Sequence, residues 1–110
     1  MHGKALSPGQ MELVAERFRA LGERSRLQIL HALRGGERTV SRLMDETGIG
    51  QANLSKHLQL LHRLRFVDRR KEGLNTWYWL ADPTVFQLCS LVCGRIGREA
   101  GERKKLFAGR

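Results

Sequence analysis

The stretch TVSRLMDETGIGQANLSKHLQLLHRL, residues 39–64, decides the fold of this chain. Its first part is typical of a short helix, because Thr39 is a capping residue and Gly48 is a stop signal. Ile49-Gly50 then makes a turn, with Ile49 inserted into the core. The second part has the period of a longer helix, Gln51–Leu64, whose apolar face carries Leu54, Leu58, Leu61 and Leu64. The stretch therefore predicts two helices joined by a tight turn.

A β-hairpin is predicted directly after these helices, with strands at Val67–Arg70 and Thr76–Leu80. Trp77, Tyr78 and Trp79 are strand formers, which we expect to pack within the hairpin and core rather than stack on single-stranded bases. The tip, RRKEGLN at residues 69–75, is basic and turn-prone. Helix, turn, helix and basic hairpin is the layout of a winged helix-turn-helix, which reads duplex DNA.

Further helices are predicted on both sides of this unit. Ser7-Pro8-Gly9-Gln10 has the pattern of a capping box, and Gly22 ends the helix that follows. A second helix is expected over about residues 24–33, a short strand over 38–40, and a last helix from Asp82-Pro83. We therefore expect a mainly α protein with a small β-hairpin, forming one domain over residues 1–110. In this interpretation residues 97–110 are a flexible, basic tail.

The last helix carries a wide apolar stripe that a small domain cannot cover by itself. Pairing with its copy in a second chain would bury this stripe, so we expect a homodimer. The interface residues expected on this helix are Val85, Phe86, Val92 and Ile96.

The net charge of the chain is +9, and most of the excess is local. Residues 51–71 hold six Lys or Arg against one Asp or Glu, which is +5, and residues 95–110 hold six against two, which is +4. Basic charge on the predicted second helix and wing favours a polyanionic partner. No apolar run is long enough to span a bilayer, and residues 1–10 lack the core of a signal peptide. We therefore expect a cytoplasmic protein without a membrane partner.

Three segments together resemble the ArsR/SmtB family of small winged-helix repressors, over roughly residues 14–96. They are Gly22-Glu-Arg-Ser-Arg-Leu27, the tip Arg69-Arg-Lys-Glu-Gly73, and a second helix with Gln51, Ser55, His57 and Leu58. The family typically has Gly-Asp-Pro-Thr-Arg-Leu in the first segment and Gln-x-x-x-Ser-x-His-Leu in the helix. Arg24 replaces the usual proline and Arg65-Phe66 the usual Gly-Leu, neither of which should alter the fold. The resemblance implies a homodimer paired through the first and last helices, which adds Val14 and Phe18 to the expected interface. It also implies a repressor that leaves its promoter when an inducer binds. In this family the inducer is often a metal or metalloid ion and sometimes a reactive sulfur species or oxidant.

The predicted DNA contacts lie on the second helix and the wing. Glutamine can pair with adenine through two hydrogen bonds, serine can contact a base or a phosphate, and lysine suits phosphate. A basic hairpin tip suits phosphates or a minor groove. The candidate residues are Gln51, Asn53, Ser55, Lys56, His57, Arg69, Arg70 and Lys71. For His57 we leave open whether it touches phosphate or supports the helix.

The only two cysteines, Cys89 and Cys93, are the candidates for inducer sensing. Their i, i+4 spacing puts both thiols on one helix face, where two thiolates can share a soft metal or metalloid ion or react with a sulfur species. The alternative is plain packing, since both lie on the apolar stripe and buried cysteine behaves as a small hydrophobe. Two thiolates fall short of a four-ligand zinc site. The family's arsenic motif in residues 39–47 and its histidine-containing zinc pattern in the last helix are both missing.

No arrangement of residues typical of catalysis is visible, so we interpret the chain as a DNA-binding regulator and not an enzyme. Its expected partners are a double-stranded operator with an inverted repeat and a second copy of itself. Two alternatives remain open at this point. One is a basic nucleic-acid-binding structural module without operator specificity or inducer, and the other is a winged helix used as a protein-interaction surface.

Overall fold

Two helices meet at a tight turn near Gly48, as the sequence predicts, and the other elements are arranged around them. In the computed structural model, which describes residues 5–108, α3 spans Val40–Thr47 and α4 spans Gln51–Arg63. The side chain of Thr39 caps α3 by accepting a hydrogen bond from the amide of Arg42 at 3.2 Å. Gly48 ends α3 in the left-handed conformation, at φ 74°, which glycine adopts without a steric cost.

Two more helices precede this pair and begin where the sequence predicts. Helix α1 spans Pro8–Leu21 and α2 spans Arg24–Ala32, followed by a 3-10 turn, η1, at Leu33–Gly35. The capping box of α1 is present, since Ser7 and Gln10 each accept a hydrogen bond from the other's amide. The predicted helix over residues 24–33 is thus confirmed, with its last turn tightened.

Three antiparallel strands form the sheet, in the order β1-β3-β2. Strand β1 is Arg38–Thr39, β2 is Val67–Glu72 and β3 is Asn75–Leu80. The hairpin is therefore longer than predicted, and pairing continues to the tip. Gly73, at φ 63°, occupies the first central position of its two-residue turn, which only glycine fills easily.

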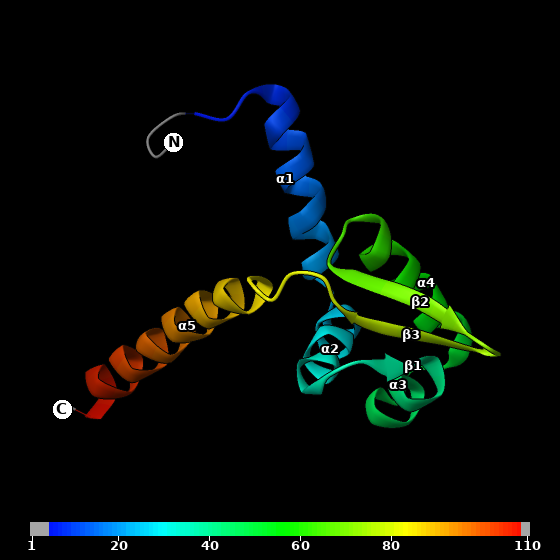
Figure 1. Ribbon diagram of the computed structural model, residues 1–110. Coiled ribbons are helices and arrows are strands. Elements are labelled where there is room, and N and C mark those ends of the chain that lie inside the picture. The colour runs from blue at the N-terminus through cyan, green and yellow to red at the C-terminus, as the bar shows by residue number, and fades with distance from the viewer. Residues whose placement is uncertain (1–4, 109–110) are drawn as a thin grey trace.

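The core lies between α2, α3 and α4 and the face of the sheet that carries Tyr78 (Figure 1). All four leucines predicted for the apolar face of α4 are buried, and full burial of each stabilises the fold by roughly 1.5–3 kcal/mol. The buried cluster contains Ile29, Leu30, Leu33, Leu43, Leu54, Leu58, Leu61, Val67, Tyr78 and Val85.

Helix α5, Val85–Ala108, departs from the prediction at both ends. Asp82-Pro83 forms a turn rather than the helix start, because the Asp82 carboxylate accepts from the amide of Thr84 at 3.0 Å. The expected flexible tail from residue 97 is helical up to Ala108, and its last two residues lie outside the described part of the chain. Glutamate, lysine and arginine favour helix there, and Arg95 pairs with Glu99 one turn on.

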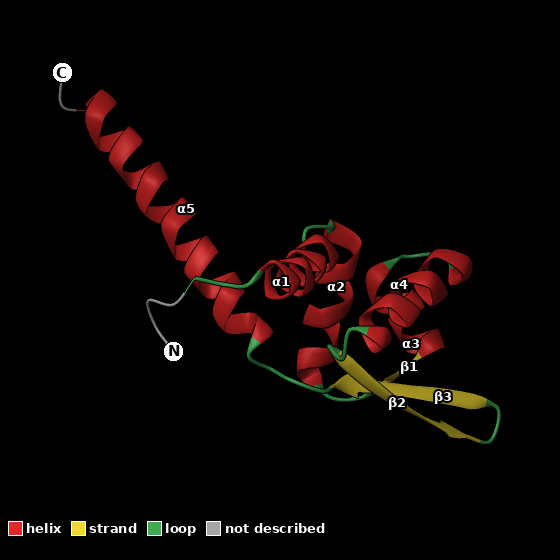
Figure 2. Ribbon diagram, turned by 90° about the horizontal axis from the view of Figure 1, so that it is seen from above, coloured by secondary structure: helices red, strands yellow, loops and turns green. Residues whose placement is uncertain are grey.

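Helix α1 projects from the rest of the molecule in Figure 1, and α5 extends away from it in both Figure 1 and Figure 2. The described chain measures 62 × 38 × 22 Å along its principal axes. Only the beginning of α5 is anchored: Val85 is buried, and Phe86 packs edge-on against His31 with ring centres 5.1 Å apart. Within residues 5–108, no helix is both long enough and apolar enough to cross a membrane.

A strained residue joins α4 to the hairpin. Arg65 lies at φ 67°, in the left-handed region where the family usually has glycine. The amide of Arg65 donates to the carbonyl of His62 and that of Phe66 to the carbonyl of Leu61, which is the hydrogen-bond pattern of a Schellman motif. Arginine in place of glycine leaves the fold unaltered, as predicted. It does place a side chain in a backbone conformation that is energetically less favourable for arginine than for glycine.

Candidate nucleic-acid interface

The first half of α4 exposes its polar side chains on the side away from its leucines. Gln51, Asn53 and Lys56 are exposed and Ser55 is half-buried, while Leu54 beneath them is completely buried. A helix held by its apolar face in this way presents fixed amide, hydroxyl and ammonium groups to a ligand. These are the groups that read base edges and phosphates in a major groove.

His57, which we included among the DNA contacts, faces the protein instead. Its Nδ1 lies 3.3 Å from a guanidinium nitrogen of Arg26, and its Nε2 lies 3.8 Å from a carboxylate oxygen of Glu23. Both partners belong to the start of α2, and the side chain of His57 is only 20% exposed. The structure therefore supports the option that His57 holds the helix.

The wing exposes two cations on the sheet face that carries Tyr78. Arg69 is opposite Tyr78 in the ladder and Lys71 is opposite Thr76, so these four side chains share a face. Tyr78 is buried against the helices, whereas Arg69 and Lys71 are exposed nearer the tip. Within the described residues, neither cation lies within ion-pair distance of a carboxylate. Both are therefore available to phosphates.

Arg70, the third predicted wing contact, points to the opposite face and is already engaged. Its guanidinium donates two hydrogen bonds to Glu37, at 2.6 and 2.9 Å, and lies 5.6–5.7 Å from the ring centres of Trp77 and Trp79. The hydrogen bond from Arg70 lowers the pKa of Glu37, and the same bond raises the pKa of Arg70. Arg70 thus fastens the wing to the segment before β1, a role that the sequence prediction missed.

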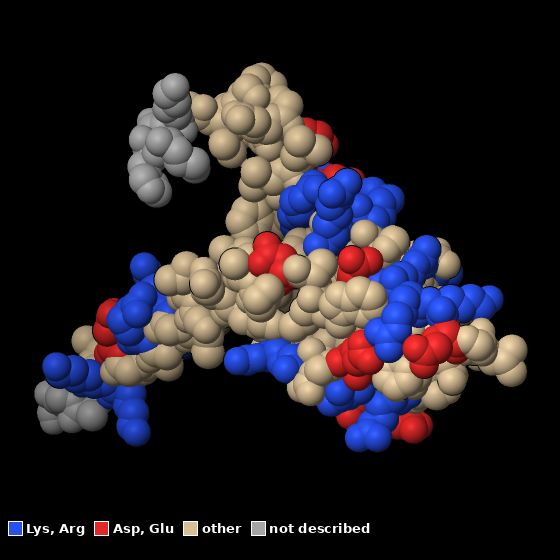
Figure 3. Space-filling view, in the orientation of Figure 1, with Lys and Arg blue, Asp and Glu red and all other residues tan. Residues whose placement is uncertain are grey.

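Positive charge is spread over several parts of the surface. Figure 3 shows Lys and Arg side chains over the part of the molecule where Figure 1 places α4 and the hairpin, beside the lower half of α1, and at the far end of α5. Acidic side chains lie among them near the hairpin, where Glu37 and Glu46 pair with arginines.

Both terminal helices expose apolar side chains, but not all of those predicted. Val14, Phe18, Val92 and Ile96 are 37–60% exposed, as a partner surface requires. Val85 and Phe86 pack against the chain's own core instead, because they begin α5 where it is still anchored. Further exposed apolar residues on these helices, which the predicted interface did not include, are Met11, Leu13, Leu88 and Leu91.

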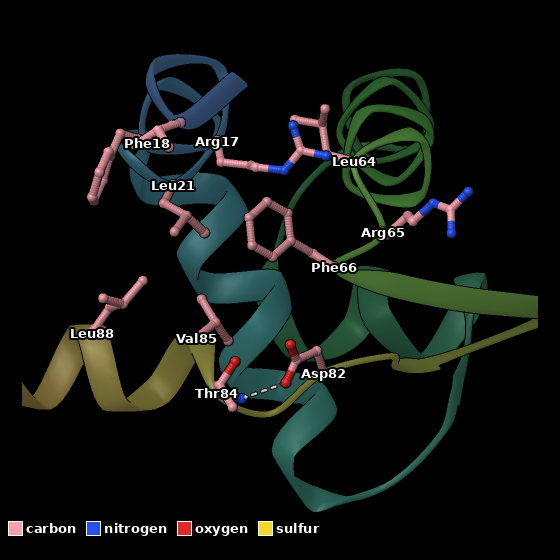
Figure 4. Close-up of a pocket in the computed structure, with 11 residues that line it drawn as sticks. Arg17, Phe18, Leu21, Leu64, Arg65, Phe66, Asp82, Thr84, Val85 and Leu88 are labelled. Atoms are coloured by element: carbon pink, nitrogen blue, oxygen red, sulfur yellow. Dashed lines mark hydrogen bonds between the residues drawn. The ribbon is translucent and has the colours of Figure 1, made fainter. Parts of the chain in front are cut away.

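An open pocket of about 390 Å³ connects the apolar faces of α1 and α5 (Figure 4). Phe18 and Leu21 of α1, Phe66 before β2, and Val85 and Leu88 of α5 surround it in the close-up. Arg65 also belongs to the lining, but its guanidinium points away. The pocket thus lies between the apolar faces of the two helices, with the polar side chains of Arg17, Asp82 and Thr84 also in its lining.

The two cysteines differ in exposure. Cys89 is half-buried and Cys93 is exposed on the next turn of α5, and both are free thiols. Within residues 5–108, no group of three or more His, Cys, Asp or Glu side chains is arranged to hold a metal ion.

An α3–turn–α4 unit with an exposed polar helix and a basic antiparallel wing defines a winged helix-turn-helix DNA-binding protein. Residues 23–69 match the family model described as bacterial regulatory protein, arsR family. An uncharacterized HTH-type transcriptional regulator of Methanocaldococcus jannaschii is 37% identical over 82 residues, which cover 74% of this chain and 92% of that protein. The chain belongs to the ArsR family. Members of this family are transcriptional regulators rather than enzymes.

Solved structures agree with this assignment. The homodimeric winged helix-turn-helix DNA-binding domain of a possible ArsR-family regulator from Mycobacterium bovis has a TM-score of 0.74 at 31% identity, covering 93% of this chain and 95% of that one. The AntR antimony-specific transcriptional repressor has a TM-score of 0.75 at 27% identity, with 92% and 93% coverage. Some relatives are longer, and the chain spans only 64–65% of two bacterial ones. These comparisons confirm the predicted fold class, and they confirm the prediction that the chain is a DNA-binding transcriptional regulator.

Proposed function

We propose that two copies of the chain, each acting as one DNA-binding domain, form a cytoplasmic repressor that binds an inverted-repeat operator. The observation that carries this proposal is the exposed polar half of α4 beside a wing with two free cations. In support of pairing, α1 and α5 leave Phe18, Val92 and Ile96 57–60% exposed, and the Mycobacterium bovis neighbour is homodimeric. A twofold dimer places its two reading helices about 34 Å apart, one turn of DNA.

In this proposal the DNA contacts divide into two kinds. Gln51, Asn53 and Ser55 read base edges in the major groove, whereas Lys56, Arg69 and Lys71 neutralise phosphates. His57 and Arg70 hold the helix and the wing in place without contacting DNA. Selecting duplexes from a random pool tests the proposal, which expects an enriched inverted repeat. A pool without enrichment, despite tight salt-dependent binding, would favour a structural nucleic-acid module.

The proposed inducer is a thiophile that binds Cys89 and Cys93, with a trivalent metalloid or a reactive sulfur species favoured over zinc. Support comes from the two thiols on adjacent turns of α5, one of them exposed, and from the structural likeness to an antimony-specific repressor. An inducer releases DNA only if it binds the free dimer more tightly than the DNA-bound dimer. Bridging the two thiolates would bend or shift the dimer helix and so provide that difference.

A gel-shift titration under reducing conditions tests the inducer. Arsenite or a persulfide donor should release wild-type protein from the selected duplex, while the Cys89→Ser, Cys93→Ser double variant stays bound. Identical curves for the two proteins would leave the cysteines with a packing role only.

A further inference from the structure

The side chain of Arg26 connects three helices. Its Nε donates to the carbonyl of Ala20 at 2.6 Å and an Nη donates to the carbonyl of Arg19 at 3.2 Å, both in the last turn of α1. Its other Nη lies 3.3 Å from Nδ1 of His57 on α4. The amide of Arg26 also donates to Glu23, the N-cap of α2. One guanidinium therefore binds the end of α1 to the middle of α4.

The chemistry of this contact assigns the roles of the two ring nitrogens. An arginine guanidinium can only donate, so Nδ1 of His57 is the acceptor in the hydrogen bond from Arg26, which is the Nε2–H tautomer of the ring. Nε2 then points toward the Glu23 carboxylate, 3.8 Å away. At the negative end of the α1 dipole, the cation donates to the carbonyl of Ala20 and adds a second donor to the carbonyl of Arg19, which also accepts from the amide of Gly22 at 3.3 Å.

We propose that Arg26 and His57 are positioning residues, which set the orientation of α4 relative to α1 and thereby the fit of the dimer to DNA. The inference rests on the function proposed above, because α1 carries part of the apolar face that pairs two copies and α4 carries the reading side chains. Phe18, two residues before Ala20, is 57% exposed on that apolar face. A shift of α1 when the dimer forms or rearranges is passed through this guanidinium to α4.

Two substitutions of His57 separate this role from direct DNA contact. Asparagine places its amide near the position of Nδ1 and can still accept from Arg26, whereas glutamine places its amide near Nε2 and cannot. Arg26→Lys keeps the charge at the end of α1 but loses the planar fork that spans α1 and α4. We expect His57→Asn to bind the selected duplex nearly as tightly as wild type. His57→Gln and Arg26→Lys should each lose about tenfold.

Three further readouts distinguish positioning from contact. The slope of log affinity against log salt should stay unchanged, because no phosphate contact is removed. The double variant Arg26→Lys, His57→Gln should be no weaker than the weaker single variant, because both changes break one link. In the free protein, amide hydrogen exchange over residues 51–57 should be faster in His57→Gln and Arg26→Lys than in His57→Asn.

The outcomes that overturn the proposal are specific. If His57→Asn is as weak as His57→Gln and the double variant is additive, His57 contacts DNA directly. If exchange over residues 51–57 is equal in all variants, the contact only packs. A failure of the proposed function has a different signature, since random duplex selection would then give no enriched sequence. The hydrogen-exchange experiment needs no DNA, so it shows whether Arg26 orders α4 even if the proposed function fails. If Arg26→Lys does not fold, comparing His57→Asn with His57→Gln answers the same question.

Discussion

The molecule has two kinds of region: a body, α2 to β3, that carries the DNA-reading helix, and two arms, α1 and α5. Large apolar residues are mostly buried in the body and mostly exposed in the arms. In the body, the leucines of the helices form the core and some arginines pair with carboxylates: Leu58 is completely buried, and Arg70 is held by Glu37. In the arms, large apolar residues such as Phe18 and Val92 remain exposed. The body buries its apolar residues within one chain, whereas the arms need a second chain to bury theirs. Folding and dimer formation should therefore be separable by experiment.

Val92→Glu should give the largest effect, because it puts a charge at the centre of the exposed face of α5. We expect the dimer to dissociate into folded monomers and operator affinity to fall about a thousandfold, as one half-site replaces two. Light scattering at micromolar concentration reports the mass, and Gln87→Glu, an exposed position on the same helix, is the matched control. Unchanged dimer mass in Val92→Glu would place the interface elsewhere.

Two substitutions compare how much the body and the arms contribute to the stability of a single chain. Leu58→Ala and Phe18→Ala are both made in the Val92→Glu background, so that both variants are monomers. Leu58 is completely buried, so its truncation should lower the free energy of unfolding by about 3 kcal/mol. Phe18 is 57% exposed, so its truncation should change that free energy by less than about 0.5 kcal/mol. Urea unfolding followed by circular dichroism measures both. Equal losses would show that α1 is part of the core of a single chain.

Lys71→Ala and Arg70→Ala separate the two faces of the wing. Loss of Lys71 should weaken specific and nonspecific binding alike, by a few-fold, and reduce the salt slope by about one. Loss of Arg70 should leave that slope nearly unchanged and reduce affinity by freeing the wing from Glu37. Affinity measured at several salt concentrations distinguishes them. A salt slope that drops equally in both variants would mean that Arg70 leaves Glu37 for phosphate.

Arg65→Gly should stabilise the protein by about 1 kcal/mol, because it removes a side chain from a left-handed position at φ 67°. Arg65→Ala is the control: it removes the same charge but keeps the strain, and should gain little. Thermal unfolding at matched protein concentration measures both. Equal stabilisation by the two substitutions would assign the effect to charge instead of backbone conformation.

Much of the body follows from local sequence signals. Thr39 and Gly48 bound α3, and the leucine spacing of α4 identifies the buried face. Local signals cannot show which distant side chains meet: Glu37 and Arg70 are 33 residues apart, and Arg26 and His57 are 31 apart. His57 and Arg70, which the sequence predicted to contact DNA, therefore bind other residues of the protein instead.

The errors on α5 have a similar origin. Helical spacing shows that Val85, Phe86 and Val92 belong to an apolar stripe, but it does not show where the chain's own core ends and the exposed face begins. The sequence predicts a flexible basic tail from residue 97, but the glutamate, lysine and arginine residues of this segment favour helix, and α5 continues to Ala108.

The smallest expected effect concerns acid stability, and it again belongs to the body. The hydrogen bond from Arg70 lowers the pKa of Glu37 in the folded protein. A carboxyl group with a lowered folded-state pKa stabilises the fold fully above its unfolded pKa, near 4.3 for a free glutamate, and this contribution is lost as the pH falls through the folded value. Wild type should therefore lose slightly more stability than Glu37→Gln between about pH 5 and pH 3. A hydrogen bond from Arg42 lowers the pKa of Glu46 in the same way, so the Glu37→Gln variant should keep some acid sensitivity. Urea midpoints for both proteins across this range provide the measurement, and parallel curves would mean that solvent screens the Glu37–Arg70 pair completely.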